Sequence, residues 1–151
     1  MTVYLVRHAD ALSRHGWARA DALRPLAEHG FVQAAGLVGL LGGHPITRML
    51  TSPAVRCRQT LEPLAGQLRV EIEDAPALLE GAPVKAARAL LDSVADTEVV
   101  LCSHGDIIPD LVNQLIAEGM DARGRDAKKG STWVLAHNGK RFVKGRYLPA
   151  P

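Results

Sequence analysis

Two apolar runs that lie far apart in this chain end in the same way. Residues 3–8 are Val-Tyr-Leu-Val-Arg-His, and residues 99–104 are Val-Val-Leu-Cys-Ser-His. Short runs rich in aliphatic and β-branched residues are typical of buried strands. In an open parallel sheet, ligands bind beyond the carboxyl ends of the strands. Two strands that end in His8 and His104 therefore predict a single pocket.

The rest of the chain alternates between strand-like and helical patterns. Helical spacing of apolar residues occurs in residues 31–41, 55–65, 84–91 and 107–116, and further strands are expected at residues 46–50 and 68–72. Two segments joined through Asn138-Gly139, residues 131–136 and 141–147, predict a terminal hairpin. This order predicts an α/β fold, a three-layer sandwich with a mostly parallel central sheet, helices on both faces and a C-terminal hairpin. We expect a single domain over residues 1–151.

Composition narrows the class of protein. A hydrophobic fraction of 47% and a charged fraction of 23% are typical of a globular protein in water. The net charge of +2 gives no argument for a nucleic-acid or membrane partner. Two cysteines cannot form a disulfide framework, and neither a charged leader nor a membrane-length apolar run is seen. We therefore expect a cytoplasmic protein, whose oligomeric state the sequence leaves open.

Cationic residues accompany the two histidines. Arg7 adjoins His8, and Arg56 lies near a predicted helix start at which Ser52 is a candidate N-cap. Helix N-termini attract anions, and arginine offers paired donors that match phosphate oxygens. Positive neighbours also keep an imidazole neutral and therefore nucleophilic at neutral pH. Together with His104, these groups predict a phosphoryl cage and transfer of phosphate to a histidine and then to water.

Other chemistries lack their signatures. Neither Cys57 nor Cys102 has an arginine at the spacing of the cysteine-phosphatase loop, and no glycine-flanked serine elbow is present. Metal-ligand spacings and the glycine loops of nucleotide cofactors are missing as well. We expect neither a metal nor another cofactor.

Four motifs in order resemble the histidine phosphatase (phosphoglycerate mutase-like) superfamily. The motifs are Arg7-His8-Ala9, Arg24-Pro25-Leu26 with Gly30 and Gln33-Ala34, Ser52–Thr60, and Ser103-His104-Gly105. The short chain and the Arg-Pro-Leu element resemble the small SixA-type phosphohistidine phosphatases. Residues 57–65, 108–111 and 129–134 also resemble the phosphatase-like domain that is fused to some bacterial Nudix hydrolases.

The resemblance implies a role for each matched residue. His8 would be the phosphorylated nucleophile, and Arg7, Arg56 and His104 would bind the phosphoryl group. Glu80 falls where relatives place a general acid or base, although a plain surface glutamate fits the loop almost as well. Two further residues remain open: Asp10 is either the alternative proton donor or a turn residue, and Arg24 is either a third cation of the pocket or a solvated arginine.

Two residues depart from the family motifs, and one loop near the predicted site is short. Ala9 replaces the signature glycine, and Ala27 replaces a helix-capping threonine or serine, at a cost of about 1 kcal/mol of stability. Only residues 73–82 separate the third predicted strand from the next helix, which predicts an open site.

An open site suits a phosphohistidine or phosphoprotein, or the end of a nucleotide, better than a buried metabolite, and we expect a phosphohistidine or phosphoprotein substrate. The alternatives are a small phosphorylated molecule such as a nucleoside di- or triphosphate, and a phosphate-binding regulatory module without turnover. The basic group of Arg123, Arg125, Lys128 and Lys129 in the predicted loop 119–130 is either a solvated surface or a contact for a nucleotide or an acidic partner.

Overall fold

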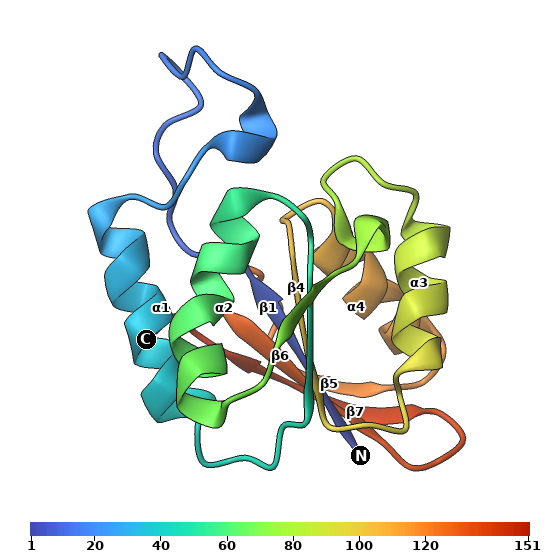
Figure 1. Ribbon diagram of the computed structural model, residues 1–151. Helices are drawn as coiled ribbons and strands as arrows, with labels where there is room; N and C mark the ends of the chain where they lie inside the picture. The colour runs from blue at the N-terminus through green and yellow to red at the C-terminus, as the bar shows by residue number, and fades with distance from the viewer.

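The computed structural model describes residues 1–151, in which strands and helices alternate (Figure 1). The strands are β1 (Thr2–Arg7), β2 (Arg48–Thr51), β3 (Ile72–Asp74), β4 (Val99–Ser103), β5 (Asp121–Arg123), β6 (Thr132–His137) and β7 (Phe142–Leu148). The helices are α1 (Glu28–Leu41), α2 (Val55–Leu68), α3 (Val84–Ser93) and α4 (Ile107–Ala117), with 3₁₀ turns η1 (Asp21–Leu23) and η2 (Pro76–Leu78).

All strands join one seven-stranded sheet in the order β3-β2-β4-β1-β6-β7-β5. Strands β1 to β4 run parallel to one another, whereas β6 is antiparallel to both β1 and β7. The predicted α/β class, the mostly parallel sheet and the C-terminal hairpin are confirmed. β1 and β4, which carry the two histidine motifs, are direct neighbours at the centre of the sheet.

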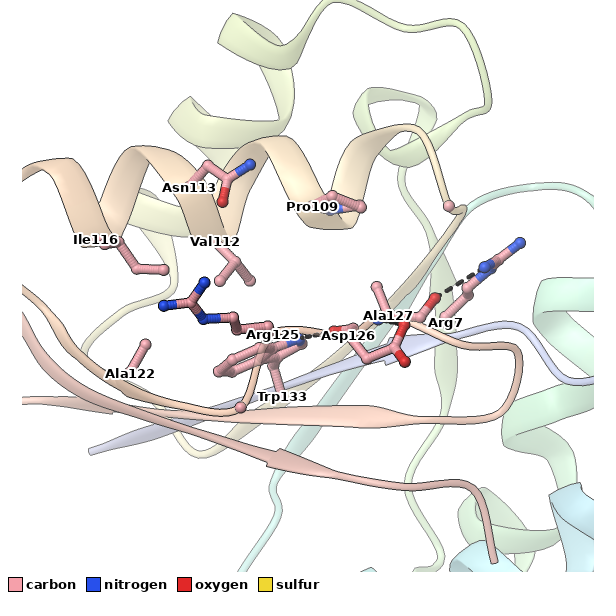
Figure 2. A pocket seen from close by; sticks show the side chains of 12 residues that line it. Arg7, Pro109, Val112, Asn113, Ile116, Ala122, Arg125, Asp126, Ala127 and Trp133 are labelled. Carbon is pink, nitrogen blue, oxygen red and sulfur yellow. Dashed lines mark hydrogen bonds between the residues drawn. The ribbon is translucent and has the colours of Figure 1, made fainter.

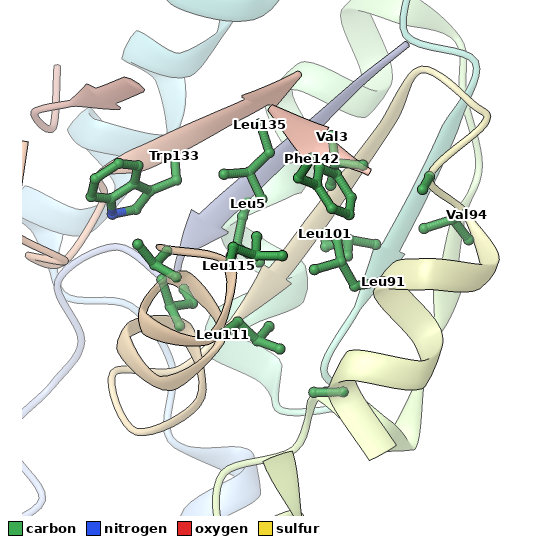
Figure 3. Packing of buried hydrophobic residues seen from close by; sticks show 14 of the residues in the cluster. Val3, Leu5, Leu91, Val94, Leu101, Leu111, Leu115, Trp133, Leu135 and Phe142 are labelled. Carbon is green, nitrogen blue, oxygen red and sulfur yellow. The ribbon is translucent and has the colours of Figure 1, made fainter. Parts of the chain in front are cut away.

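Alternating side chains of the central strands build a core on each face of the sheet. Val3, Leu5 and Leu101 point to one face of the sheet and pack against α3 and α4, as Figure 3 shows. Tyr4 and Val6 point to the other face, which α1 and α2 cover. Burial of each such aliphatic side chain contributes about 1.5–3 kcal/mol to the stability of the folded state. Both central strands are therefore stabilised by packing on both faces of the sheet.

Three details of the sequence prediction were wrong. β5 lies inside the segment 119–130 that was predicted to be a loop, because three residues at a sheet edge leave no periodic pattern to read. β3 is found at Ile72–Asp74, mostly beyond the predicted residues 68–72. α2 begins at Val55 with Ala54 before it, so Ser52 does not cap this helix.

None of the helices combines the length and the apolar character that crossing a membrane requires.

Candidate active site

The two histidines lie side by side where β1 and β4 end. Arg7 is opposite Ser103 in the parallel register, and the N–H of His8 donates to the carbonyl of Ser103 at 3.0 Å. The imidazole rings of His8 and His104 are 5.3 Å apart, centre to centre, in an edge-to-face arrangement with an interplanar angle of 64°. The two strand ends therefore bring His8 and His104 next to each other, as the sequence predicts.

His8 is held as a neutral imidazole with one nitrogen free. Its Nδ1 lies 2.8 Å from the carbonyl oxygen of Ala9, so Nδ1 carries the proton and Nε2 keeps its lone pair. Burial lowers the pKa of His8 to about 3, and the charges of His104, Arg56 and Arg7 act in the same direction, against the hydrogen bond to Ala9. His8 is therefore an unprotonated base, and a potential nucleophile, throughout the neutral pH range.

His104 is fixed from behind by α2 and the loop that precedes it. Its Nε2 lies 2.8 Å from Ser52 Oγ and 3.5 Å from Cys57 Sγ, while Nδ1 faces Nη2 of Arg56 at 3.4 Å. Ser52 thus orients His104. The sequence missed this role because a serine before a helix is ordinarily interpreted as a cap. Cys57 and Cys102 are both fully buried, which removes them as exposed nucleophiles.

Two arginines supply buried positive charge beside the histidines. Arg56 is only 1% exposed, and Arg7 is partly buried at the end of β1. The Nε atoms of both arginines are buried without a hydrogen-bond partner. Buried polar groups are rarely left unpartnered outside functional sites. Donors of this kind, set around a neutral imidazole, fit the oxygens of a phosphoryl group.

Gly105 leaves the space that the Arg7 guanidinium occupies. A Cβ atom at residue 105 would lie 2.6 Å from Cζ of Arg7, which is too close for a real contact. The family-like Ser103-His104-Gly105 motif therefore delivers one histidine and also clears space for an arginine from the neighbouring strand.

Two carboxylates lie over the arginines. Asp21, in η1, receives hydrogen bonds from Nη2 of Arg56 and Nε of Arg24, both at 3.1 Å. Although desolvation raises it, the pKa of Asp21 is lowered overall by the hydrogen bond from Arg24 and the positive charges around it. Glu80 lies 3.5 Å from Nη2 of Arg56 and accepts two hydrogen bonds from Arg14, at 3.1 and 3.2 Å.

The structure separates the two candidate proton donors. Glu80 lines the cavity of about 400 Å³ beside His8, together with Arg24. Asp10 does not line this cavity; its carboxylate lies 3.9 Å from Nδ1 of His29 and 3.8 Å from Nζ of Lys129. Arg24 is 6% exposed and is tied to Asp21 and to the carbonyl of Leu12, so it is a buried cation of the pocket wall rather than a solvated arginine.

The remaining motif residues hold the loop that follows β1. The amide oxygen of Gln33 accepts from the N–H of Asp10 at 2.8 Å, that of Gln59 accepts from Leu26 at 2.9 Å, and Thr60 Oγ1 accepts from Ala9 at 2.9 Å. Because these backbone groups have side-chain partners, the chain beyond His8 has a defined path. No group of three or more His, Cys, Asp or Glu side chains is placed to hold a metal ion.

Comparison with known proteins assigns the family. Residues 3–82 match the model of the histidine phosphatase superfamily (branch 1). The chain belongs to this superfamily of hydrolases.

Two curated histidine phosphatase relatives differ in their named activities. The chain is 37% identical over 157 residues to the 8-oxo-(d)GTP phosphatase of Mycolicibacterium smegmatis, and the match covers 99% of this chain but 48% of the relative. It is 30% identical to phosphohistidine phosphatase SixA of Escherichia coli, over 76% of this chain and 74% of the relative. The chain thus spans about half the length of the mycobacterial relative.

Solved histidine phosphatase structures show the same fold. The structure of SixA in complex with tungstate superimposes with a TM-score of 0.77 at 24% identity, covering 99% of this chain and 95% of that one. A SixA-like protein from Nakamurella multipartitia gives a TM-score of 0.76 at 25% identity, with 99% and 95% of the two chains covered. The predicted phosphoglycerate mutase-like architecture is confirmed.

Substituting Gly105 tests the arrangement of Arg7. Gly105→Ala should displace the guanidinium and lower kcat/KM for a small phosphate ester by about 10²-fold, since a misplacement of about 1 Å has effects of this size. Because a flexible side chain absorbs the clash, the free energy of unfolding should change little. The matched control is Gly39→Ala, on the exposed side of α1 with no atom within 4 Å of the added Cβ. Equal activity of the two variants would contradict the arrangement.

The neutral state of His8 predicts a pH dependence of stability. Below its ordinary pKa of 6.5 the unfolded chain binds a proton at His8, whereas the folded chain does not until about pH 3. His8 therefore contributes stability above pH 6.5 that is lost as the pH falls toward 3. Between these limits the free energy of unfolding of the wild type should fall more steeply than that of His8→Asn, by up to about 1.4 kcal/mol per pH unit. Urea titrations would check this, and parallel curves would contradict it.

Proposed function

We propose that this protein hydrolyses the terminal phosphate of a nucleotide through a phosphohistidine intermediate on His8. One observation carries the chemistry: a buried, neutral His8 with a free Nε2 lies at a cavity that Arg7 also lines, beside His104, which Arg56 contacts in turn. A phosphoryl group in transfer spreads charge over its equatorial oxygens, and fixed cationic donors stabilise that charge.

In the first step, the lone pair of His8 Nε2 attacks phosphorus and the bond from phosphorus to the leaving oxygen breaks. Glu80, which lines the same cavity, acts in its protonated form and gives its proton to that oxygen. In the second step, water attacks the phosphorus of phospho-His8 while the Glu80 carboxylate takes its proton. The phosphorus–nitrogen bond then breaks, phosphate leaves, and His8 and Glu80 return to their starting states.

A nucleotide substrate has more support than a phosphohistidine protein. The relative named 8-oxo-(d)GTP phosphatase matches 99% of this chain at 37% identity, whereas SixA matches 76% at 30% identity. The mycobacterial relative is about twice as long, so its named activity is that of a larger protein. The comparisons therefore favour the nucleotide, which the sequence offered only as the alternative, over the phosphoprotein that it preferred.

A silent phosphate-binding module is the weaker alternative. Such a module would need the cationic donors but neither a nucleophile in its reactive tautomer nor a carboxylate beside the leaving group. Here His8 has its Nε2 free, and Glu80 lies at the same cavity. The geometry therefore supports turnover.

The substrate class can be tested with four phospho-donors. We expect kcat/KM for 8-oxo-GTP and GTP to exceed that for a phosphohistidine peptide by at least about tenfold, with p-nitrophenyl phosphate as a donor that needs only the cage. Labelled nucleotide, quenched rapidly, should leave acid-labile, base-stable phosphate on the wild type and none on His8→Ala. A higher kcat/KM for the peptide would overturn the nucleotide assignment, and labelling of His8→Ala would overturn the proposed nucleophile.

The role of Glu80 can be separated from that of Asp10. Glu80→Gln should lower kcat by about 10²–10³-fold for a nucleoside monophosphate, whose alkoxide leaving group needs a proton. The loss should be much smaller for p-nitrophenyl phosphate, whose leaving group needs none. Asp10→Asn, which removes a carboxylate outside the cavity, is the matched control and should stay near wild type. A larger loss in Asp10→Asn would transfer the proton-donor role to Asp10.

A further inference from the structure

A second and larger cavity of about 620 Å³ adjoins the phosphate cage. Arg7 and Gly105 line both cavities, so the two cavities adjoin each other at the Arg7 side chain. Figure 2 shows this cavity between α4 on one side and the sheet with Trp133 on the other, with Arg7 at one end. Its volume lies within the range of about 300–1,000 Å³ that is typical of small-molecule sites.

The floor and one wall of this cavity are apolar. Trp133, which is 2% exposed, lies on the sheet side, and Val112 and Ile116 face it from α4. Ile116 is 42% exposed, so its side chain is accessible to a ligand in this cavity. A wall that pairs an indole ring with aliphatic side chains suits a flat, weakly polar group.

Two polar side chains at this cavity have no partner within the protein. The Asn113 amide and the Arg125 guanidinium line the cavity, and neither side chain takes part in a hydrogen bond or an ion pair. Figure 2 shows Arg125 extended between the helix and the sheet, with Asn113 above it on α4. By contrast, Arg56 and Arg24 beside His8 both donate hydrogen bonds to Asp21.

The segment that carries Arg125 is held by hydrogen bonds to the two residues that follow it. The indole N–H of Trp133 donates to the carbonyl of Asp126 at 2.8 Å, and Nη1 of Arg7 donates to the carbonyl of Ala127 at 2.8 Å. The cavity wall is therefore tied directly to the arginine of the phosphate cage. A ligand whose phosphate lies at His8 would pass Arg7 to reach this cavity.

Few groups match such a cavity as well as a purine base. Its flat face can lie against the apolar wall, and its edge carries the donors and acceptors that asparagine and arginine side chains bind in nucleic-acid complexes. The imidazole of a phosphohistidine is too small to use both the apolar wall and the two polar groups. We propose that this cavity binds the base of the nucleotide substrate, with Asn113 and Arg125 contacting its polar edge. This inference rests on the nucleotide phosphatase function proposed above.

The test compares nucleotides with a substrate that has no base. Asn113→Ala and Arg125→Ala should each lower kcat/KM for 8-oxo-GTP and GTP by about tenfold, mainly through KM, and leave p-nitrophenyl phosphate unchanged. Arg123→Ala is the matched control, because it removes the same charge from β5 at a residue that does not line the cavity. Ile116→Trp, which fills the cavity from an exposed helical position, should abolish the preference for nucleotides over p-nitrophenyl phosphate.

Binding can also be followed without turnover. The chain has two tryptophans, so a variant that carries Trp17→Phe keeps Trp133 as its only indole, and adding His8→Ala removes the proposed nucleophile. In this variant GMP should change the fluorescence of Trp133 with an affinity that Asn113→Ala weakens about tenfold.

The possible failures are distinguishable. Wild type that hydrolyses p-nitrophenyl phosphate but no nucleotide would overturn the proposed function and this inference together. Wild type that hydrolyses nucleotides while Asn113→Ala and Arg125→Ala match it on every substrate would overturn this inference alone.

Discussion

The parallel pairing of β1 with β4 is the constraint on which the site depends. Residue by residue it aligns Val3 with Val99 through to Arg7 with Ser103, so that His8 and His104 leave the sheet next to each other. Both strands are buried on both faces, and a slip of one residue would send their apolar side chains to the wrong faces. The distance between the two imidazoles is thus set by the hydrophobic core and not by a flexible loop.

The buried charges near His8 are a second constraint, because they fix the positions of Arg56 and of η1. Buried guanidinium groups are costly unless they are paired, and Arg56 is paired with Asp21 and approached by Glu80. A phosphoryl oxygen at Arg56 would meet the same Nη2 atom that binds Asp21, so substrate binding and the position of η1 are coupled. The Nε atoms of Arg7 and Arg56 are buried and have no hydrogen-bond partner in the protein.

The sequence was informative where chemistry follows a regular element. His8, Arg7 and His104 could be found because they follow recognisable strands, and Arg56 because it follows a helix start. Asp21 could not be found, since apolar periodicity fails over residues 10–24 and only the folded loop brings its carboxylate to Arg56. Ser52 was misinterpreted for a related reason: a local capping pattern and a long-range hydrogen bond to His104 require the same residue type. The sequence could not choose between Glu80 and Asp10 as the proposed proton donor, because only the folded chain shows that Glu80 lines the cavity beside His8 and Asp10 does not.

The match to the family model ends at residue 82, and this boundary separates the residues around His8 from most of those that line the larger cavity. The matched part holds His8, Arg7 and Arg56, to which we assign the handling of the phosphoryl group in the proposed mechanism. The larger cavity is built mostly from later residues, on α4, β5 and the segment 124–127. Superfamily membership therefore constrains the chemistry at phosphorus more than the identity of the leaving group. Arg7 joins the two parts, because one guanidinium faces the cage and also donates to Ala127. A substitution in segment 124–127 that moves this carbonyl would be felt by Arg7, so that the leaving-group side of the site and the phosphate cage cannot vary independently.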